Sequence, residues 1–371
     1  MAAEAKPKHD SFQKAERIIL RSTDQEGILS TSEIASSTNG AGERRERVYE
    51  LLDRLDIQYS EVCHPPMFTQ ADSEAHRVQI DAVIFKNLFL CNKNKSRYYL
   101  YSLPLAKRAD LAAVAAALGE TRFSFGNEEA LQEKLNIQHG AVSFLNVIGV
   151  ENTDVSILID SSVFFCNRIG VHPNDNTATV ILQPQDIERI LNACRVKYRF
   201  LATESGEFVI SKAQETDIAD ILRLQRAAYQ SEAIIYNNYT IQPLTQTPEQ
   251  ATADFHDSIV FKATLDGNII GSVRAFEKGD TVYIGKLMVM PGYQNRGLGK
   301  RLLQSVESGF PGRRYELYTG AMSAKNLALY ENTGYSRFKT EEAAPGLTLV
   351  YLEKPPGGKR MHDQYRRLEW L

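Results

Sequence analysis

The sequence predicts two α+β domains, each built on a mixed β-sheet with flanking helices. Its 371 residues exceed what one ordinary hydrophobic core accommodates, so two domains of roughly 150 residues each are expected. Helical and strand patterns alternate without the strict rhythm of βαβ units, which favours mixed sheets over purely parallel ones. The pattern resets at the polar run TESGE, residues 203–207. We therefore predict a flexible extension at 1–42, domains at 43–203 and 207–354, and a tail at 355–371.

In the first domain, helices are predicted where apolar residues recur on one face and where a polar residue caps the start. Asp110 and Asn127 are such caps, and Gly119 ends the helix that Asp110 begins. Runs of apolar and β-branched residues predict the strands. The expected helices are 43–55, 110–118, 127–135 and 184–193, and the expected strands are 57–62, 82–91, 97–103, 156–159 and 177–182.

The second domain begins with a strand and an amphipathic helix and continues with three strands in quick succession. The turns DGN at 266–268 and KGD at 278–280 separate these three strands, as expected for hairpins. The expected strands are 208–212, 259–265, 269–277, 281–289, 314–319, 335–338 and 348–353, and the expected helices are 215–230, 247–254, one beginning at 297, and 326–333.

Composition excludes several classes of protein. Hydrophobic content of 43%, charged content of 24% and a net charge of −3 are ordinary for a globular protein and leave no overall basic excess for coating nucleic acid. Any RNA contact must therefore be local. The first ten residues are polar, and no apolar run approaches the ~18 residues that cross a bilayer, so neither a secretory signal nor a membrane span is expected. Four scattered cysteines predict reduced thiols in a cytoplasmic protein without a metal site.

The sharpest local signal is a strand, a glycine-rich turn and a helix over residues 281–308. The turn reads QNRGLGK at 294–300. Backbone N–H groups at a helix N-terminus bind phosphate, and glycines let the phosphate approach the backbone closely. The turn therefore predicts a diphosphate site. An ordinary glycine turn before a basic helix is the alternative that this segment leaves open.

The order of elements, this Q-x-x-G-x-G run and the stretch SAKNLALYENTGY at 323–335 resemble the GNAT superfamily of N-acetyltransferases. The resemblance implies a GNAT fold, with a central mixed sheet flanked by helices, and acetyl-CoA as the cofactor. It also implies that Tyr330 protonates the departing CoA thiolate, a role that a hydrogen-bond donor can fill. A core aromatic on an amphipathic helix is the alternative for Tyr330. The implied cofactor-binding residues are Leu287, Met288, Val289, Gln294, Asn295, Arg296, Gly297, Leu298, Gly299, Lys300 and Asn326.

The general base of this reaction is not identified by the sequence. Glu277, Asp280 and Glu316 are candidates by their positions near strand ends, and each could equally be a solvated surface charge. The segment 236–247 lies where the family places its acceptor amine, whose identity is unknown, and its side chains could line that site or cap the next helix.

Three clusters stand out in the first domain: CHPPMFT at 63–69, KNLFL at 86–90 and GVHPNDNTAT at 170–179. Lys86 interrupts an apolar strand, so it either extends its charged end to the surface or is held for chemistry. The run HPNDNT forms turns, and a tight loop is its alternative interpretation.

Taken in this order, the clusters resemble the YbaK/prolyl-tRNA synthetase-associated editing domain, and most closely the free-standing deacylases of Ala-tRNA(Pro). The resemblance implies hydrolysis of an aminoacyl ester at the 3′ end of a mischarged tRNA(Pro), without a metal. It assigns catalytic roles to Lys86, Asn87 and His172, because the carbonyl that acquires negative charge needs a cation or N–H donors. The implied substrate-binding residues are Phe68, Thr69, Gly140, Ser143 and Asn174.

One position departs from this family. Phe144 stands where the family's G-x-x-x-P loop has proline, beginning here at Gly140. A missing proline loosens the loop backbone, and the larger side chain could intrude on the pocket.

The sequence therefore favours a bifunctional enzyme that edits mischarged aminoacyl-tRNA and transfers acetyl groups to an amine. The alternatives are an acetyltransferase whose first domain only docks tRNA, and an adaptor that docks prolyl-tRNA synthetase. We hypothesise further that both halves act on related substrates, since the α-amine of an aminoacyl-tRNA is itself an acetyl acceptor.

Overall fold

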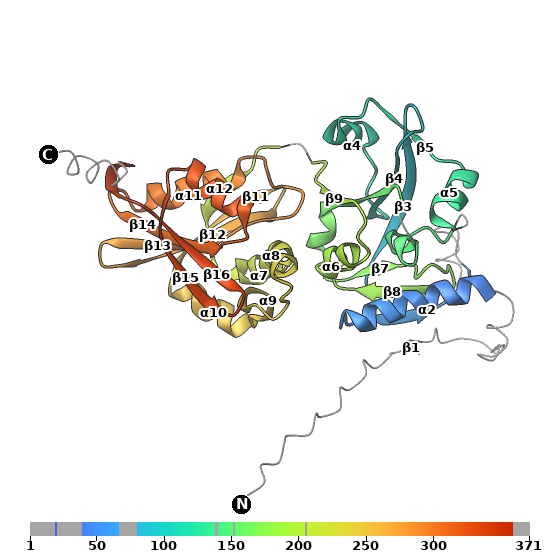
Figure 1. Cartoon of the computed structure of the whole chain (residues 1–371), viewed down its shortest axis with the longest axis horizontal. Coiled ribbons are helices and arrows are strands. Elements are labelled where there is room, and N and C mark those ends of the chain that lie inside the picture. Colours follow the sequence, from blue (N-terminus) through green and yellow to red (C-terminus); the bar gives the residue numbers. More distant parts are fainter. Residues whose placement is uncertain are drawn as a thin grey trace, which may run out of the picture.

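The computed structural model describes residues 19–20, 39–66, 80–137, 140–150, 153–204 and 206–358. The chain forms two lobes that lie side by side, the first coloured blue to green and the second yellow to red (Figure 1). Each lobe contains one sheet with helices packed against it, which confirms the predicted pair of α+β folds.

The first lobe is built on a mixed nine-stranded sheet of the order β1-β2-β8-β7-β3-β4-β6-β9, with β5 paired to β3. Strand β3 is antiparallel to β4 and parallel to β7, and β4 is parallel to β6. These strands are β1 (Ile19–Leu20), β2 (Ser60–Cys63), β3 (Val83–Asn92), β4 (Tyr98–Pro104), β5 (Phe123–Phe125), β6 (Val155–Asp160), β7 (Ile169–Val171), β8 (Ala178–Leu182) and β9 (Tyr198–Leu201).

Helices of the first lobe begin at the predicted caps. The Asp110 side chain accepts a 2.9 Å hydrogen bond from the Ala113 N–H, and Asn127 accepts one of 3.1 Å from the Ala130 N–H. Each cap satisfies a backbone donor that the first helical turn leaves unpaired. The helices are α2 (Asn39–Arg54), α4 (Leu111–Leu118), α5 (Glu128–Leu135) and α6 (Asp186–Ala193), with the 3₁₀ turns η1 (Phe144–Val147) and η2 (Ser161–Phe165).

The second lobe is built on a seven-stranded sheet of the order β10-β11-β12-β13-β14-β16-β15. All its neighbouring strands are antiparallel except β13 and β14, which are parallel. The strands are β10 (Val209–Lys212), β11 (Ile259–Leu265), β12 (Asn268–Lys278), β13 (Thr281–Val289), β14 (Arg314–Gly320), β15 (Ser336–Ala344) and β16 (Leu347–Lys354).

Helices cover both faces of this second sheet. A Cβ atom on Gly271 of β12 would meet Leu298 and Leu302 of α11, whereas the next residue, Ser272, lines a pocket with α7. Because successive strand residues point to opposite faces, α11 and α7 lie on opposite sides of the sheet. The helices are α7 (Ile218–Ala228), α8 (Gln230–Tyr236), α9 (Gln242–Thr245), α10 (Pro248–His256), α11 (Leu298–Gly309) and α12 (Ala324–Asn332).

The structure differs from the sequence prediction after α7. A single helix was expected over 215–230, but α7 ends at Ala228 and a separate helix, α8, begins at Gln230. Ile221, Leu222 and Leu224 continue the apolar face of α7, and this periodicity does not reveal the change of direction at Tyr229.

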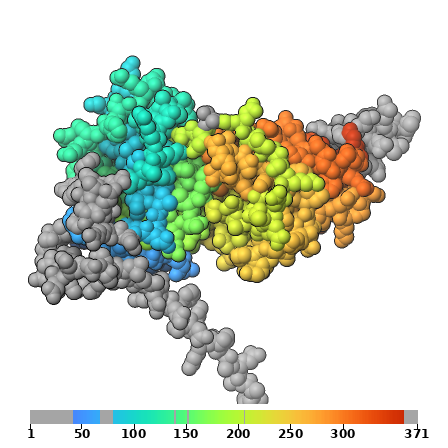
Figure 2. Space-filling view, turned by 180° about the vertical axis from the view of Figure 1, so that it is seen from behind, coloured from blue at the N-terminus to red at the C-terminus, as the bar shows by residue number. Residues whose placement is uncertain are grey.

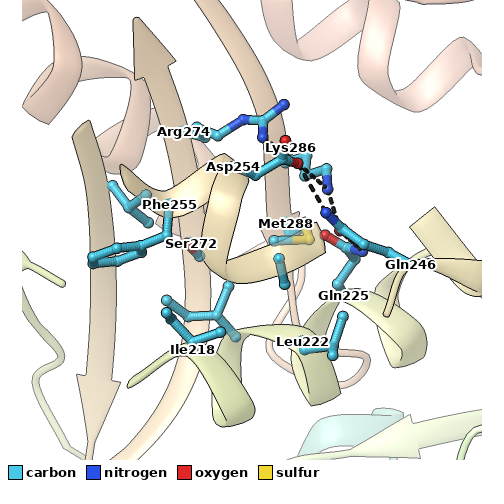
Figure 3. Close-up of a pocket in the computed structure, with 13 residues that line it drawn as sticks. Ile218, Leu222, Gln225, Gln246, Asp254, Phe255, Ser272, Arg274, Lys286 and Met288 are labelled. Carbon is cyan, nitrogen blue, oxygen red and sulfur yellow. Dashed lines mark hydrogen bonds and ion pairs between the residues drawn. The ribbon is translucent and has the colours of Figure 1, made fainter. Parts of the chain in front are cut away.

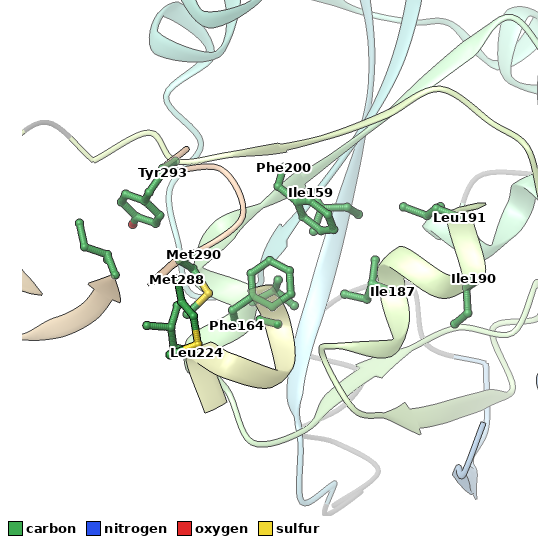
Figure 4. Packing of buried hydrophobic residues seen from close by; sticks show 14 of the residues in the cluster. Ile159, Phe164, Ile187, Ile190, Leu191, Phe200, Leu224, Met288, Met290 and Tyr293 are labelled. Atoms are coloured by element: carbon green, nitrogen blue, oxygen red, sulfur yellow. The ribbon is translucent and has the colours of Figure 1, made fainter. Parts of the chain in front are cut away.

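The two lobes share one hydrophobic core. Figure 4 shows Phe164 of η2 and Leu224 of α7 at the junction, and both belong to the same cluster of buried residues as Met290. At the same junction, a Cβ atom on Gly292 would collide with the Ser161 hydroxyl of the first lobe. The space-filling view shows the lobes in direct contact (Figure 2). The lobes are therefore packed together rather than joined only by the connection between β9 and β10.

The described part of the chain holds no helix that is both long and apolar enough to cross a membrane.

Candidate functional site

The predicted phosphate-binding turn connects β13 to α11. Gly297 is the N-cap of α11 with φ +77°, in the left-handed region, and Asn295 before it has φ +61°. A Cβ atom on Gly297 would have no atom within 4 Å, so open space lies over the start of the helix. The first N–H groups of α11 have no partner within the helix and carry the positive end of its dipole. This geometry fits a bound diphosphate.

Two neighbours hold this turn in place. Arg296 donates a 2.6 Å hydrogen bond to the Ala202 carbonyl of the first lobe, and Gln294 donates one of 3.3 Å to the Val289 carbonyl. Both side chains were predicted to bind a cofactor. In the structure each of them also supports the turn.

Strands β13 and β14 are paired only at their beginning. Their parallel pairing ends at Tyr283 and Glu316, so among the described residues β13 has no strand paired on that side beyond this point. On the other side, the register with β12 shifts between Ser272 and Arg274, and Lys286 at this bulge has φ +50°. A bulge bends the strand and redirects its backbone. Leu287, Met288 and Val289, the predicted cofactor contacts, follow directly after it.

Helix α12 brings the predicted Asn326 and Tyr330 to this region. The Asn326 amide donates a 3.1 Å hydrogen bond to Glu232 of α8, and the Ser323 hydroxyl donates one of 2.5 Å to the same carboxylate. Tyr330 is buried, and its pKa is raised by burial and by the nearby Tyr229 and Glu232. A raised pKa keeps the hydroxyl protonated, as a proton donor requires.

A pocket lies between α7, α10 and the β12–β13 pair (Figure 3). Apolar side chains such as Leu222, Phe255 and Met288 form part of its wall. Lys286 is 13% exposed and lies 3.3 Å from Asp254, which also forms a 2.5 Å ion pair with Arg274. The remaining lining residues are Ile218, Ile221, Gln225, Gln246, Ala251, Val260 and Ser272.

The three carboxylates that were considered as a general base lie elsewhere. Glu277 and Asp280 pair with Arg313 at 2.7 and 3.1 Å, and Glu316 pairs with Arg314 at 2.7 Å. They cluster at the closed end of the β13–β14 pair. Glu232, which was not considered, is the carboxylate that contacts Asn326.

In the first lobe, β3 carries Lys86 and Asn87. The Lys86 amine donates a 2.9 Å hydrogen bond to the Leu105 carbonyl, and no ion pair involves Lys86 in the described ranges. Strands β3 and β7 are parallel, with Ile84 opposite Gly170. This pairing ends there, and Lys86 and His172 each lie two residues farther along the chain.

Asn87 and Asn174 are linked by the loop that begins at Gly140. Asn87 donates a 2.8 Å hydrogen bond to the Val142 carbonyl, and Asn146 donates one of 2.7 Å to the side-chain oxygen of Asn174. Within the loop, the Ser143 N–H donates a 2.6 Å hydrogen bond to the side-chain oxygen of Asn146.

Asn174 has an unusual environment. It is almost completely buried with φ +62°, and its amide nitrogen Nδ2 has no hydrogen-bond partner among the described residues. A buried donor without a partner costs free energy unless a ligand or water satisfies it. Asn174 is therefore a candidate contact for an acceptor atom of a ligand.

His64 and His172 form an edge-to-face pair with ring centroids 5.9 Å apart. His172 Nδ1 lies 3.0 Å from the Ala178 carbonyl, and His64 Nε2 lies 3.0 Å from the Thr179 hydroxyl. Burial lowers the pKa of both histidines. Both rings are therefore mostly neutral at pH 7, and His172 contacts the Ala178 carbonyl as a neutral ring.

Phe144, the residue that departs from the family's loop, lies in the hydrophobic core. It begins η1, and its side chain is 0% exposed within the hydrophobic core. Phe68 and Thr69 lie outside the described residues. In the part of the chain that the structure describes, no group of three or more histidine, cysteine or acidic side chains is placed to hold a metal.

Sequence reasoning missed Glu232, Asn146 and Lys286. Lys286 had a detectable signal, because it is a lone lysine in an apolar strand, as Lys86 is. Glu232 and Asn146 had none, since each meets its partner only through tertiary packing.

Family models match both lobes. The model described as the aminoacyl-tRNA editing domain matches residues 64–190, and the model of the acetyltransferase (GNAT) family matches residues 218–335.

Several curated proteins are similar to the first lobe. The prolyl-tRNA editing protein ProX of Acetoanaerobium sticklandii is 34% identical over 149 residues, covering 40% of this chain and 91% of that protein. The prolyl-tRNA synthetase associated domain-containing protein 1 of Danio rerio is 28% identical over 172 residues, covering 44% of this chain and 93% of that protein.

Solved structures match about as much of the chain. The ribosomal-protein-S18-alanine N-acetyltransferase of Escherichia coli is 18% identical with a TM-score of 0.34, covering 40% of this chain and 92% of that one. An N-acetyltransferase of Staphylococcus aureus is 19% identical with a TM-score of 0.33, covering 40% and 99%.

Proposed function

Because this chain belongs to the aminoacyl-tRNA editing family in its first lobe and to the GNAT acetyltransferase family at residues 218–335, we propose that it is a bifunctional enzyme. Its second lobe transfers an acetyl group from acetyl-CoA to an amine. Its first lobe hydrolyses a mischarged aminoacyl-tRNA, with Ala-tRNA(Pro) as the substrate. The cytoplasm is the compartment where both reactions take place.

The acetyltransferase proposal rests chiefly on one observation, the open space over the N-terminus of α11 at Gly297. The N–H groups of Leu298, Gly299 and Lys300 hold the diphosphate of CoA there. The free edge of β13 at Leu287, Met288 and Val289 offers backbone groups to the pantetheine arm. Asn295 and Arg296 flank the phosphates, and Asn326 contacts the arm from α12.

Acetyl-CoA supplies a thioester whose carbonyl carbon bonds the amine nitrogen while its carbon–sulfur bond breaks. Tyr330 donates the proton that the sulfur needs, and the raised pKa of its hydroxyl keeps that proton available at neutral pH. Glu232 lies beside Asn326 and accepts the proton that the amine loses. Two groups with opposite proton-transfer roles thus lie at the same opening of the sheet.

Calorimetry with acetyl-CoA, followed by transfer assays with a panel of amines, tests this proposal. Tyr330→Phe should bind acetyl-CoA like wild type and lower kcat by about 100-fold, the usual scale for loss of a general acid. Tyr283→Phe is the matched control, since the Tyr283 ring stacks on Phe276 at the closed end of the strand pair. Failure of the wild-type chain to bind acetyl-CoA would eliminate this half of the proposal.

The editing proposal rests on the hydrogen bonds that join Asn87 and Asn174 to the loop that begins at Gly140, with Lys86 next to Asn87 on β3. The ammonium group of Lys86 stabilises the negative charge that develops on the ester carbonyl oxygen as water attacks. The free Nδ2 donor of Asn174 binds an acceptor atom of the aminoacyl group. Ser143 binds the aminoacyl group as well, and His172 takes part as a neutral ring. Phe68 and Thr69, which lie outside the described residues, stay candidate substrate contacts.

The names of the relatives support prolyl-tRNA as the tRNA involved, since the bacterial protein is named for editing prolyl-tRNA and the fish protein for a domain associated with prolyl-tRNA synthetase. Deacylation of Ala-tRNA(Pro) tests this proposal. Lys86→Ala should lower the rate by about 100-fold, the scale for loss of one stabilising donor. Lys93→Ala, an exposed lysine in the turn after β3, is the control.

A second candidate function is an acetyltransferase whose first lobe only docks tRNA or prolyl-tRNA synthetase. Equal deacylation rates for the wild type and Lys86→Ala, with tRNA binding retained, would favour this candidate over editing.

A further inference from the structure

The pocket behind the bulge of β13 combines apolar walls with a charged end. Leu222, Phe255 and Met288 contribute to the apolar wall, and Figure 3 shows Arg274, Asp254 and Lys286 gathered at one end. Hydrogen bonds join Gln246 to Lys286, to Gln225 at 2.8 Å and to Asp254 at 2.8 Å. The charged end is therefore an ordered network rather than a set of loose surface side chains.

The charges in this pocket do not balance. Its lining has two cations, Lys286 and Arg274, and one carboxylate, Asp254, which contacts both of them. Burial and the nearby Arg274 lower the pKa of Lys286 despite the presence of Asp254. Excess positive charge in a half-buried site is stabilised by a bound anion.

The pocket lies close to the groups that act on the amine. Lys286 is the bulge residue directly before Leu287 to Val289 on β13. Tyr229 lies between α7, whose Leu222 lines the pocket, and α8, which carries Glu232. The pocket and Glu232 are therefore held by consecutive helices.

We propose that this pocket holds the carboxylate and the apolar side chain of a free amino acid whose α-amine is the acetyl acceptor. The inference rests on the proposed acetyltransferase function and names its substrate class. Lys286 and Arg274 bind the carboxylate, and the apolar wall takes the side chain. The α-ammonium gives up two protons as its nitrogen bonds the acetyl carbon: one reaches the CoA thiol, and the other passes through Glu232 to solvent.

This substrate class connects the two lobes chemically. Hydrolysis of an aminoacyl ester releases a free amino acid, so the reaction proposed for the first lobe produces the type of molecule that this pocket fits. An aminoacyl-tRNA itself has no free carboxylate, because the ester occupies it. The pocket therefore favours the released amino acid over its tRNA ester as the acceptor.

Transfer assays with matched pairs test the inference: L-leucine against L-leucinamide, and L-alanine against L-alaninamide. Each pair differs only in the carboxylate. The acid of at least one pair should have a KM about 10- to 100-fold below that of its amide, the range expected for charge-assisted hydrogen bonds. The amine of each amide is less basic than that of the acid, so a larger fraction of it is uncharged and able to react at neutral pH. A lower KM for the acid would therefore arise despite its smaller fraction of uncharged amine. Calorimetry should also detect binding of the preferred acid to the protein without acetyl-CoA.

Lys286→Met keeps the length of the side chain and removes its charge. It should raise the KM of the acid toward that of the amide and leave the KM of the amide and the affinity for acetyl-CoA unchanged. Lys262→Met is the matched control, because Lys262 forms a similar 2.7 Å ion pair with Asp217 but does not line the pocket. Equal KM values for acid and amide in both pairs, or no acetylation of either, would overturn the inference. Failure of acetyl-CoA to bind would instead overturn the proposed acetyltransferase function. Acetyl-CoA binding without a preference for the acid would overturn only this inference.

Discussion

The Tyr293 hydroxyl donates a 3.0 Å hydrogen bond to Glu204, which connects the turn before α11 to the segment between the two lobes. Glu204 also forms a 2.5 Å ion pair with Lys107, whose amine lies 2.8 Å from the buried Asp160. The Tyr101 hydroxyl donates a further 2.6 Å hydrogen bond to Asp160. The turn before α11 is therefore connected to the central strands of the first lobe through a continuous polar network.

Removing the Tyr293 hydroxyl should destabilise the protein. Burial and the nearby Glu204 raise the pKa of Tyr293, so its hydroxyl remains a donor at all ordinary pH values. Tyr293→Phe should lower the free energy of unfolding by about 1–2 kcal/mol, measured by urea denaturation. Tyr318→Phe is the control. Tyr318 is 59% exposed, so this variant should change the free energy of unfolding little. Equal effects of the two variants would contradict a stabilising role for the Tyr293–Glu204 bond.

Gly297 and Gly312 offer a matched test of the diphosphate site. They have φ +77° and +76°, and a Cβ atom on either would have no atom within 4 Å. Alanine at each position should cost about 1–2 kcal/mol of stability through the left-handed conformation. Only Gly297→Ala should also weaken acetyl-CoA binding, by about tenfold or more, because its methyl group occupies the space for the phosphates. Calorimetry with both variants measures this, and an equal loss of affinity in Gly312→Ala would refute the assignment.

The buried histidine pair should make the first lobe sensitive to acid. Burial lowers the pKa of His64 and His172 below the ordinary value of about 6.5. The folded state therefore binds fewer protons than the unfolded state as the pH falls. The contribution of the two neutral histidines to the free energy of unfolding is fully present above about pH 6.5. It decreases as the pH falls toward the pKa values of the folded state. His172→Gln should reduce this slope in unfolding measurements between pH 7 and 5; an unchanged slope would show that other groups cause it.

Asp186 should act in the opposite direction. Burial raises its pKa to about 7, with Arg189 opposing the shift. The stabilising contribution is complete below about pH 4, the ordinary value for aspartate, and is lost as the pH rises through 7. Asp186→Asn should therefore raise the free energy of unfolding at pH 8 by about 1–2 kcal/mol. This value allows for the partial solvent exposure of Asp186 and for the helix-dipole interaction that the substitution removes. The same change at pH 4 should give no gain, and Glu133→Gln, whose side chain is 76% exposed, should give none at either pH.

Local features of the fold were predictable from the sequence. The caps Asp110 and Asn127 and the glycine-rich turn at 294–300 act through residues close in the chain, so spacing and residue type identify them. Lys86 and Tyr330 were found through motifs of the same local kind. The mixed sheet of the second lobe, flanked by helices, was expected from the resemblance to a known family.

Tertiary structure alone decided which distant residues meet. Glu232 and Asn326 are 94 positions apart, and their contact depends on the turn at Tyr229 that separates α7 from α8. The bulge that turns Lys286 toward Asp254 arises from a register shift between β12 and β13. The hydrophobic pattern of one strand does not reveal the register of its partner. The sequence by itself determined most helices and strands and the glycine-rich turn at 294–300, because these depend on local periodicity and local hydrogen bonds. The pocket lined by Lys286 and the network between the lobes required the packed structure, because long-range contacts follow from how whole elements bury their faces together.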